Sequence, residues 1–172
     1  LSSSPRRGGH SDTLCDEFMR GTVEAGNEAE KIFLGDKTVH YCTGCSVCSL
    51  HKKPCPQKDD AAGIIGKMLT ADVIVMATPV YFYTMSAQMK TLIDRCCGLY
   101  TEMSNKEFYF IVTAAEEDTR LLERTVDTFQ GFLDCLKKPL VRGVVLGTGV
   151  WHVGEIKDKP AMYEAYEMGK QV

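Results

Sequence analysis

The sequence lacks a strong charge of either sign, a long hydrophobic run and a recognisable signal peptide. Its 172 residues carry a formal net charge of −3, which gives no electrostatic footprint for nucleic acid or an anionic membrane. The longest apolar stretch, residues 73–83, is interrupted by Thr78 and Pro79 and is too short to span a membrane. The opening stretch LSSSPRRGGH is polar and glycine-rich. We therefore expect a cytoplasmic protein with neither nucleic acid nor a membrane as partner.

What the sequence does contain is an alternation of short β-branched or aromatic runs with amphipathic segments. The runs are expected as buried strands over residues 30–35, 71–77, 106–113 and 141–147. Apolar residues recurring at helical spacing predict helices over residues 11–25, 61–69, 85–96, 122–136 and 161–169. Strands that alternate with helices indicate right-handed βαβ units and a single α/β domain over residues 1–172.

One strand is missing from this pattern, in front of the first helix. The loop that precedes the helix looks like a turn leaving a strand, yet only Leu1 stands before it. A central parallel strand usually has about 5 residues, so we expect the numbering to begin inside the first strand. With that strand included, the prediction is a flavodoxin-like, doubly wound, five-stranded parallel sheet of order 2-1-3-4-5, with helices on both faces.

The loop SSSPRRGGHS, residues 2–11, leads into the first predicted helix. It combines hydroxyl groups with flexible backbone at Gly8 and Gly9 and positive charge at Arg6 and Arg7. Free N–H groups and the dipole at a helix N-terminus favour an anion, so this loop suits a phosphate group. Neither G-x-G-x-x-G nor a Walker loop is present, which disfavours a dinucleotide pyrophosphate. A surface turn with ordinary serine and glycine chemistry would explain the same residues equally well.

Three consecutive aromatic residues, Tyr81, Phe82 and Tyr83, lie between the predicted strand at 71–77 and the next helix. Aromatic side chains suit the rim of a flat aromatic ligand. In the predicted strand order, this loop and the serine-rich loop face one crevice at the carboxyl ends of the strands. Phosphate at one end and a ring at the other fit FMN. The alternative is that these aromatics pack at a subunit interface, and both interpretations can hold together.

Three stretches, SSSPRRGGHSDTL, DVIVMATPVYFYTMSAQMKTLIDR and YCTGCSVC…CPQKDD, resemble the NAD(P)H-dependent FMN reductase and flavodoxin-like oxidoreductase superfamily. Within it they most resemble the iron–sulfur flavoproteins. The resemblance implies bound FMN and dimers or tetramers with flavins near the subunit interfaces. It implies phosphate contacts from Ser2, Ser4, Pro5, Arg6, Gly9, His10 and Ser11. It implies ring contacts from Pro79, Val80, Tyr81 and Phe82, and further contacts from Thr113, Ala114, Ala115 and Glu116.

Four cysteines, Cys42, Cys45, Cys48 and Cys55, fall within the loop at residues 40–58 and outside any periodic pattern. Three at x2 intervals are typical of the ligands of one cubane in bacterial ferredoxins, and Pro56 follows the fourth. The resemblance implies a [4Fe–4S] cluster, with His51, Lys52 and Lys53 offsetting the thiolate charge. Zinc, four free thiols or disulfides formed on aerobic handling are the alternatives. The other cysteines, Cys15, Cys96, Cys97 and Cys135, are expected as small buried apolar residues.

These features predict an FMN-dependent oxidoreductase that transfers electrons from NAD(P)H or a reduced carrier to a small acceptor. Quinones, flavins, azo or nitro compounds and O2-derived species are the acceptor classes. The alternative is a flavodoxin-like electron carrier that docks to redox proteins, with the cysteine loop vacant or holding zinc. No catalytic side chain is assigned, because Glu116, Glu117 and His152 read better as solvated loop residues. Tyr83 and Met85, as large groups at the rim of a small domain, predict a homodimer or homotetramer.

Overall fold

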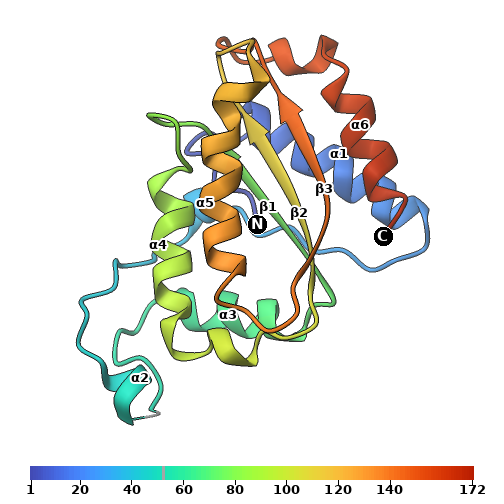
Figure 1. Cartoon of the computed structure of the whole chain (residues 1–172). Helices are drawn as coiled ribbons and strands as arrows, with labels where there is room; N and C mark the ends of the chain where they lie inside the picture. Colours follow the sequence, from blue (N-terminus) through green and yellow to red (C-terminus); the bar gives the residue numbers. More distant parts are fainter. Residues whose placement is uncertain (52) are drawn as a thin grey trace.

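Three parallel strands form the central sheet of the computed structural model, which describes residues 1–51 and 53–172. They are β1 (Val73–Pro79), β2 (Glu107–Thr113) and β3 (Leu140–Gly147), and β2 lies in the middle. Every residue of β1 has a parallel partner in β2, from Val73 opposite Glu107 to Pro79 opposite Thr113. The carboxyl ends of all three strands therefore meet at one edge of the sheet, at the top of Figure 1.

Two shorter segments continue the parallel pairing beyond β1. The backbone of Ser2 bridges Ala77 on one side and Phe33 on the other. The Ser3 N–H donates to the Ala77 carbonyl (2.9 Å), and the Leu34 N–H donates to the Ser2 carbonyl (2.8 Å). The expected strand at 30–35 is wrong as a full strand, because only Ser2 pairs with it. Phe33 makes the bridge, and the chain then turns into the 3-10 helix η1 (Leu34–Asp36).

Helices cover both faces of the sheet, and all five expected helices are present with ends shifted by a few residues (Figure 1). One layer holds α1 (His10–Glu24) and α6 (Ala161–Gly169). The other holds α3 (Ala61–Thr70), α4 (Ala87–Arg95) and α5 (Glu123–Leu133). The shorter elements are α2 (Val47–His51), η2 (Cys96–Gly98), η3 (Tyr100–Glu102), η4 (Thr119–Leu122) and η5 (Glu155–Asp158). No helix of the described chain is both long and apolar enough to cross a bilayer.

The central strand β2 divides the core in two. Side chains of successive strand residues point to opposite faces, so Phe108 and Phe110 face α3, α4 and α5, whereas Tyr109 and Ile111 face α1 and α6. Phe110 stacks on Phe129 of α5 with ring centroids 4.8 Å apart. Burial on both faces explains why this strand reads as a continuous apolar run in the sequence.

Candidate functional site

The site predicted from the sequence lies where the loops leave the carboxyl ends of the strands. Backbone hydrogen bonds join these loops to one another. The Val80 N–H, just after β1, donates to the Thr113 carbonyl at the end of β2 (2.8 Å). The Ala114 N–H donates to the Gly147 carbonyl at the end of β3 (2.9 Å). Three loops distant in the sequence thus form one continuous rim.

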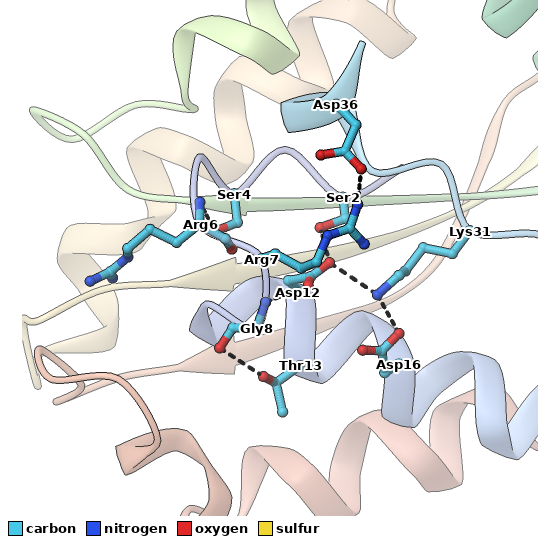
Figure 2. A network of polar contacts seen from close by, with 10 residues as sticks. All are labelled: Ser2, Ser4, Arg6, Arg7, Gly8, Asp12, Thr13, Asp16, Lys31 and Asp36. Atoms are coloured by element: carbon cyan, nitrogen blue, oxygen red, sulfur yellow. Dashed lines mark hydrogen bonds and ion pairs between the residues drawn. The ribbon is translucent and has the colours of Figure 1, made fainter.

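The serine-rich loop at residues 2–9 is held in shape by the buried carboxylate of Asp12 (Figure 2). This carboxylate accepts hydrogen bonds from the Ser2 hydroxyl (2.7 Å), the Gly8 N–H (2.8 Å) and the Lys31 ammonium (3.1 Å). Lys31 also pairs with Asp16 on the next turn of α1. Burial alone would raise the pKa of Asp12, but these donors outweigh it and the pKa is lowered.

The turn into α1 leaves no room for extra atoms. The Ser4 hydroxyl donates to the Arg6 carbonyl (2.8 Å) and accepts from the Arg6 N–H (3.1 Å). Gly9 stands directly before α1, and a Cβ there would lie 2.4 Å from the Ser4 hydroxyl oxygen. Ser11, in the first turn of α1, is 1% exposed, and its Oγ has no hydrogen-bond partner among the described residues.

An orphaned buried hydroxyl is costly unless something outside the chain pairs with it. Here the hydroxyl of Ser11 lies beside the first N–H groups of α1, which have no intrahelical acceptors. The tight turn at Gly9 brings the backbone close to the same point. This donor set fits a phosphate group.

The two arginines of the loop have different surroundings. Arg7 forms an ion pair with Asp36 and lies over the Phe33 ring, with 4.5 Å from its guanidinium carbon to the ring centroid. Figure 2 shows Arg6 pointing away from the Asp12 network, and its guanidinium has no partner among the described residues. Pro5 and Arg6 are exposed. Only Arg6 therefore remains available to an anion from solution.

A buried hydroxyl network that sequence reasoning missed ties the serine-rich loop to the aromatic loop. The Ser86 hydroxyl hydrogen-bonds to the Ser3 carbonyl (3.0 Å) and the Ser3 hydroxyl (2.9 Å). The Ser86 N–H donates to the Thr78 hydroxyl (2.9 Å), and Ser3 also donates to the Ala77 carbonyl (2.9 Å). The signal that could have found it is the position of Ser86 directly before α4, a preferred place for a helix-starting serine.

The aromatic residues lie on a tight two-residue turn. Tyr81 and Thr84 exchange backbone hydrogen bonds of 2.9 and 3.1 Å, and the two residues between them, Phe82 and Tyr83, have φ of +48° and +62°. Bulky residues with positive φ are strained and are found mainly at functional sites. Phe82 is 98% exposed. The expectation that Met85 lies at the rim is wrong, because Met85 is buried in the core.

The remaining predicted residues line the rim unevenly. Pro79 and Val80 are half-buried, and Thr113 and Ala114 are buried. Exposed at the end of the β2 loop are Ala115, Glu116 and Glu117. Their exposure agrees with the reading of both glutamates as solvated residues.

The loop after β3 also reaches the site, where sequence reasoning had considered only its His152 and had read that residue as solvated. His10 at the start of α1 hydrogen-bonds through Nε2 to the His152 carbonyl (2.7 Å). The Glu155 carboxylate accepts from the Trp151 N–H (2.6 Å) and the His152 N–H (2.9 Å), and these bonds lower the pKa of Glu155. Trp151 stays 71% exposed beside them. The signal was available, since the single tryptophan of the chain follows a predicted strand.

The cysteine loop lies at the other end of α4 from the aromatic turn (Figure 1). Cys42 and Cys45 are exposed, and Cys48 and Cys55 are half-buried. Within the described residues, no group of three or more histidines, cysteines, aspartates or glutamates is placed to hold a metal ion. The thiols fit iron–sulfur or zinc chemistry by type, but they do not converge. Lys52, expected to offset their charge, lies outside the described residues.

Two of the four remaining cysteines depart from expectation. Cys15 and Cys96 are buried as predicted, and burial raises the pKa of Cys96 to about 12. Cys97 and Cys135 are exposed, so the expectation that they are buried is wrong. Desolvation and the neighbouring thiols of Cys48 and Cys42 raise the pKa of Cys97.

A cavity of about 800 Å³ lies away from these loops, along α1 and the start of β1. Phe18, Val73 and Val75 are among its lining residues. None of the residues predicted to contact a cofactor lines this cavity. This cavity is therefore separate from the loop rim, where the sequence predicts the cofactor contacts.

A parallel α/β sheet with helices on both faces is the architecture of the flavodoxin-like class. The fold agrees with that of an NAD(P)H:quinone oxidoreductase from Methanothermobacter marburgensis, with a TM-score of 0.79 at 18% identity over 99% of this chain and 92% of that one. The family described as NADPH-dependent FMN reductase matches residues 1–150. The chain belongs to this family.

Iron–sulfur flavoproteins are among its relatives. One from Methanocaldococcus jannaschii is 43% identical over 95 residues, which are 55% of this chain and 49% of that protein. One from Archaeoglobus fulgidus is 38% identical over 95 residues, which are 55% of this chain and 43% of that protein. The matched region thus spans about half the length of these relatives.

Proposed function

We propose that this chain binds FMN at the loop rim and acts as an FMN-dependent oxidoreductase. The phosphate would be held by Ser11, Ser4, Arg6 and the first N–H groups of α1. The ring would lie against Pro79, Val80, Tyr81 and Phe82. The observation that carries the proposal is the buried Ser11 hydroxyl in the first turn of α1, which has no hydrogen-bond partner within the part of the chain that the structure describes.

Bound FMN supplies hydride and single-electron transfer, so the protein needs no catalytic acid or base of its own. The chain's part is positioning. The Ser3–Ser86–Thr78 hydroxyl network fixes the distance between the aromatic turn and the serine-rich loop at residues 2–11, hereafter the phosphate loop. The strained turn at Phe82 and Tyr83 keeps large apolar groups beside the open rim, where they exclude water from one edge of the ring.

NAD(P)H is the proposed electron donor, and a quinone, flavin, azo or nitro compound or an O2-derived species is the proposed acceptor. Family membership supports the donor, and the open rim admits small molecules. A second candidate is an electron carrier that docks to redox proteins, which the fully exposed Phe82 favours. Reduction of the FMN-loaded chain by NADPH alone supports the enzyme, whereas reduction only by a reduced carrier protein supports the carrier.

We further propose that Cys42, Cys45, Cys48 and Cys55 hold a [4Fe–4S] cluster, with zinc as the competing metal. The likeness to proteins named iron–sulfur flavoproteins and the four thiols support this proposal. Binding would have to gather the thiols from their present positions. Iron, sulfide and zinc counts on protein purified without oxygen separate the two metals.

A cytoplasmic homodimer or homotetramer and a five-stranded sheet of order 2-1-3-4-5 complete the proposal. The Ser2 bridges to Phe33 and Ala77 support this order. The exposed Tyr81, Phe82 and Tyr83 form the apolar patch that supports a subunit interface. Light scattering at micromolar concentration tests it, since a monomer with bound FMN would contradict the interface.

The phosphate assignment is tested by Ser11→Ala with Thr125→Val as a matched control. Both hydroxyls are buried and have no hydrogen-bond partner in residues 1–51 and 53–172, but Thr125 lies on α5. Losing a hydrogen bond to a charged phosphate costs about 1.5–3 kcal/mol, so Ser11→Ala is expected to weaken FMN binding about 10-fold or more. Thr125→Val is expected to leave the Kd unchanged. Equal Kd values for both variants and the parent would contradict the assignment.

A further inference from the structure

The cysteine loop is fastened to the end of α4 by a buried ion pair. Arg95 and Asp59 have side chains that are 2% and 0% exposed, with 2.5 Å between Nη1 and Oδ2. Arg95 also donates to the His40 carbonyl (2.8 Å) and to the Cys55 sulfur (3.4 Å). Asp59 accepts from the His40 N–H (2.9 Å). Both ends of the loop, at His40 and Cys55, are therefore fixed to one point on α4.

This anchoring brings the middle of the loop against the chain that follows α4. The short helix α2, which contains Cys48, contacts η2. A Cβ placed on Gly98 would lie 2.7 Å from the Cys48 Cβ and 3.3 Å from its Sγ. Only glycine at position 98 lets Cys48 come this close.

Cys97 immediately precedes Gly98 in η2. Because Gly98 packs against Cys48 and η2 contacts α2, the backbone places Cys97 beside the short helix that carries Cys48. Cys97 is exposed, so reagents in solution can reach it. The region therefore holds five thiols rather than the four of the sequence motif.

We propose that Cys48 and Cys97 form a redox-active thiol pair that closes a disulfide between the cysteine loop and the end of α4. Closure proceeds by exchange with a low-molecular-weight disulfide such as oxidised glutathione. One thiolate of the pair attacks this disulfide and releases one glutathione thiol. The second attacks the mixed disulfide and releases the other. The two protein thiols are oxidised to the disulfide, one molecule of oxidised glutathione is reduced to two thiols, and the two protons of the protein thiols pass to the two glutathione sulfurs.

The disulfide and metal binding are mutually exclusive at Cys48, because a sulfur in a disulfide is no longer a thiolate ligand. The pair does not depend on FMN, since the cysteine loop and the phosphate loop share no residue. The Cys48–Cys97 disulfide would link the exposed cysteine loop covalently to η2 whenever the thiols carry no metal.

The test treats the full chain, reduced and chelator-washed, with oxidised glutathione and maps disulfides by mass spectrometry of non-reduced peptides. A Cys48–Cys97 link at least tenfold more abundant than any link to Cys135 is expected, with two glutathione thiols released per link. Cys135 is the matched control, because it is also exposed and follows a helix end. Cys135→Ala should leave the yield unchanged, whereas Cys97→Ala should abolish the link from the loop to η2.

Two outcomes would overturn the proposal. One is a Cys48 that pairs only with Cys42, Cys45 or Cys55 while Cys97 stays a free thiol. The other is a Cys97 that carries glutathione permanently, without a second exchange. Circular dichroism of Cys97→Ala, compared with the parent chain, shows whether the variant is folded, and Cys97→Ser gives a second substitution with the same expected loss of the link.

Discussion

The phosphate loop at residues 2–11 and the cysteine loop at residues 40–58 show opposite degrees of preorganisation. In the first, Ser2, Ser3 and Ser4 are all at most 3% exposed and each side chain is hydrogen-bonded. In the second, Cys42 and Cys45 are exposed, and the strong contacts lie at the two ends. A ligand of the first loop finds its donors in place. A ligand of the cysteine loop has to draw the thiols together as it binds, as metals do for thiol sites.

The largest expected effect concerns the anchor of the cysteine loop. Arg95→Met leaves the buried carboxylate of Asp59 without its partner, which costs about 3–5 kcal/mol in free energy of unfolding. Lys90→Met on the same helix breaks the exposed pair with Asp94 and should cost at most about 0.5 kcal/mol. Urea unfolding of both variants measures the difference. Similar losses would show that the Arg95–Asp59 pair is not the anchor of the loop.

A smaller effect is expected from a single methyl group in the phosphate loop. Gly9→Ala places a Cβ against Ser4 and the Arg6 carbonyl, so we expect about 1–3 kcal/mol of destabilisation and weaker FMN binding. Gly44→Ala in the cysteine loop meets no atom within 4 Å and strains only its own backbone at φ +67°, at about 1 kcal/mol. FMN titration separates them, because only Gly9→Ala should raise the Kd. An unchanged Kd for FMN in Gly9→Ala would argue against a phosphate site that is already formed in the ligand-free chain.

The Asp12 network gives the phosphate loop a pH dependence. Because the folded pKa of Asp12 is lowered, its stabilisation is fully present above its unfolded pKa of about 3.9 and is lost as pH falls through the folded value. Asp12→Asn should therefore be less stable than the parent by about 2 kcal/mol at pH 6, and the gap should close toward pH 2. Unfolding curves at several pH values measure this gap, and a constant gap would contradict the assignment.

The smallest expected effect is that of Cys45→Ser on FMN affinity and oligomeric state. The variant should lose iron and transfer single electrons more slowly, yet keep the parent's FMN affinity and oligomeric state. The physical reason is that the cysteine loop and the aromatic turn lie at opposite ends of α4, which spans about 13.5 Å at 1.5 Å per residue for 9 residues. Electron exchange between cluster and flavin would then run across a subunit boundary. Loss of FMN or of folding in this variant would make the cysteines structural.

Local patterns in the sequence predicted the helices and the three central strands, because periodic burial leaves a direct trace in residue type. The strand predicted at 30–35 is reduced to a single bridge at Phe33, since pairing depends on a neighbour and not on the run IFL itself. The exposure of Cys97 was also missed, since residue type does not distinguish it from the buried Cys96 beside it. Sequence spacing could not show that Gly98, the residue after Cys97, packs against Cys48.

The predicted phosphate and ring residues were brought to one edge of the sheet, because parallel topology places the loops after neighbouring strands side by side. The hydroxyl pair Ser3 and Ser86 was not foreseen, since 83 residues separate them in the sequence. Of the β3 loop, only His152 was considered from the sequence, and Trp151 was missed, since its place beside the rim depends on backbone bonds from Gly149 to Glu116 and from Val150 to Ala114.

The most direct test of the central claim compares FMN with riboflavin in fluorescence titrations of the flavin-free chain. The two ligands share the ring and differ in the phosphate, so their ratio of Kd values isolates the preformed loop. Two or more charge-assisted hydrogen bonds of about 1.5 kcal/mol each predict FMN binding at least about 100 times tighter than riboflavin. Equal affinity for FMN and riboflavin would contradict the account, because the loop at residues 2–11 would then bind no phosphate.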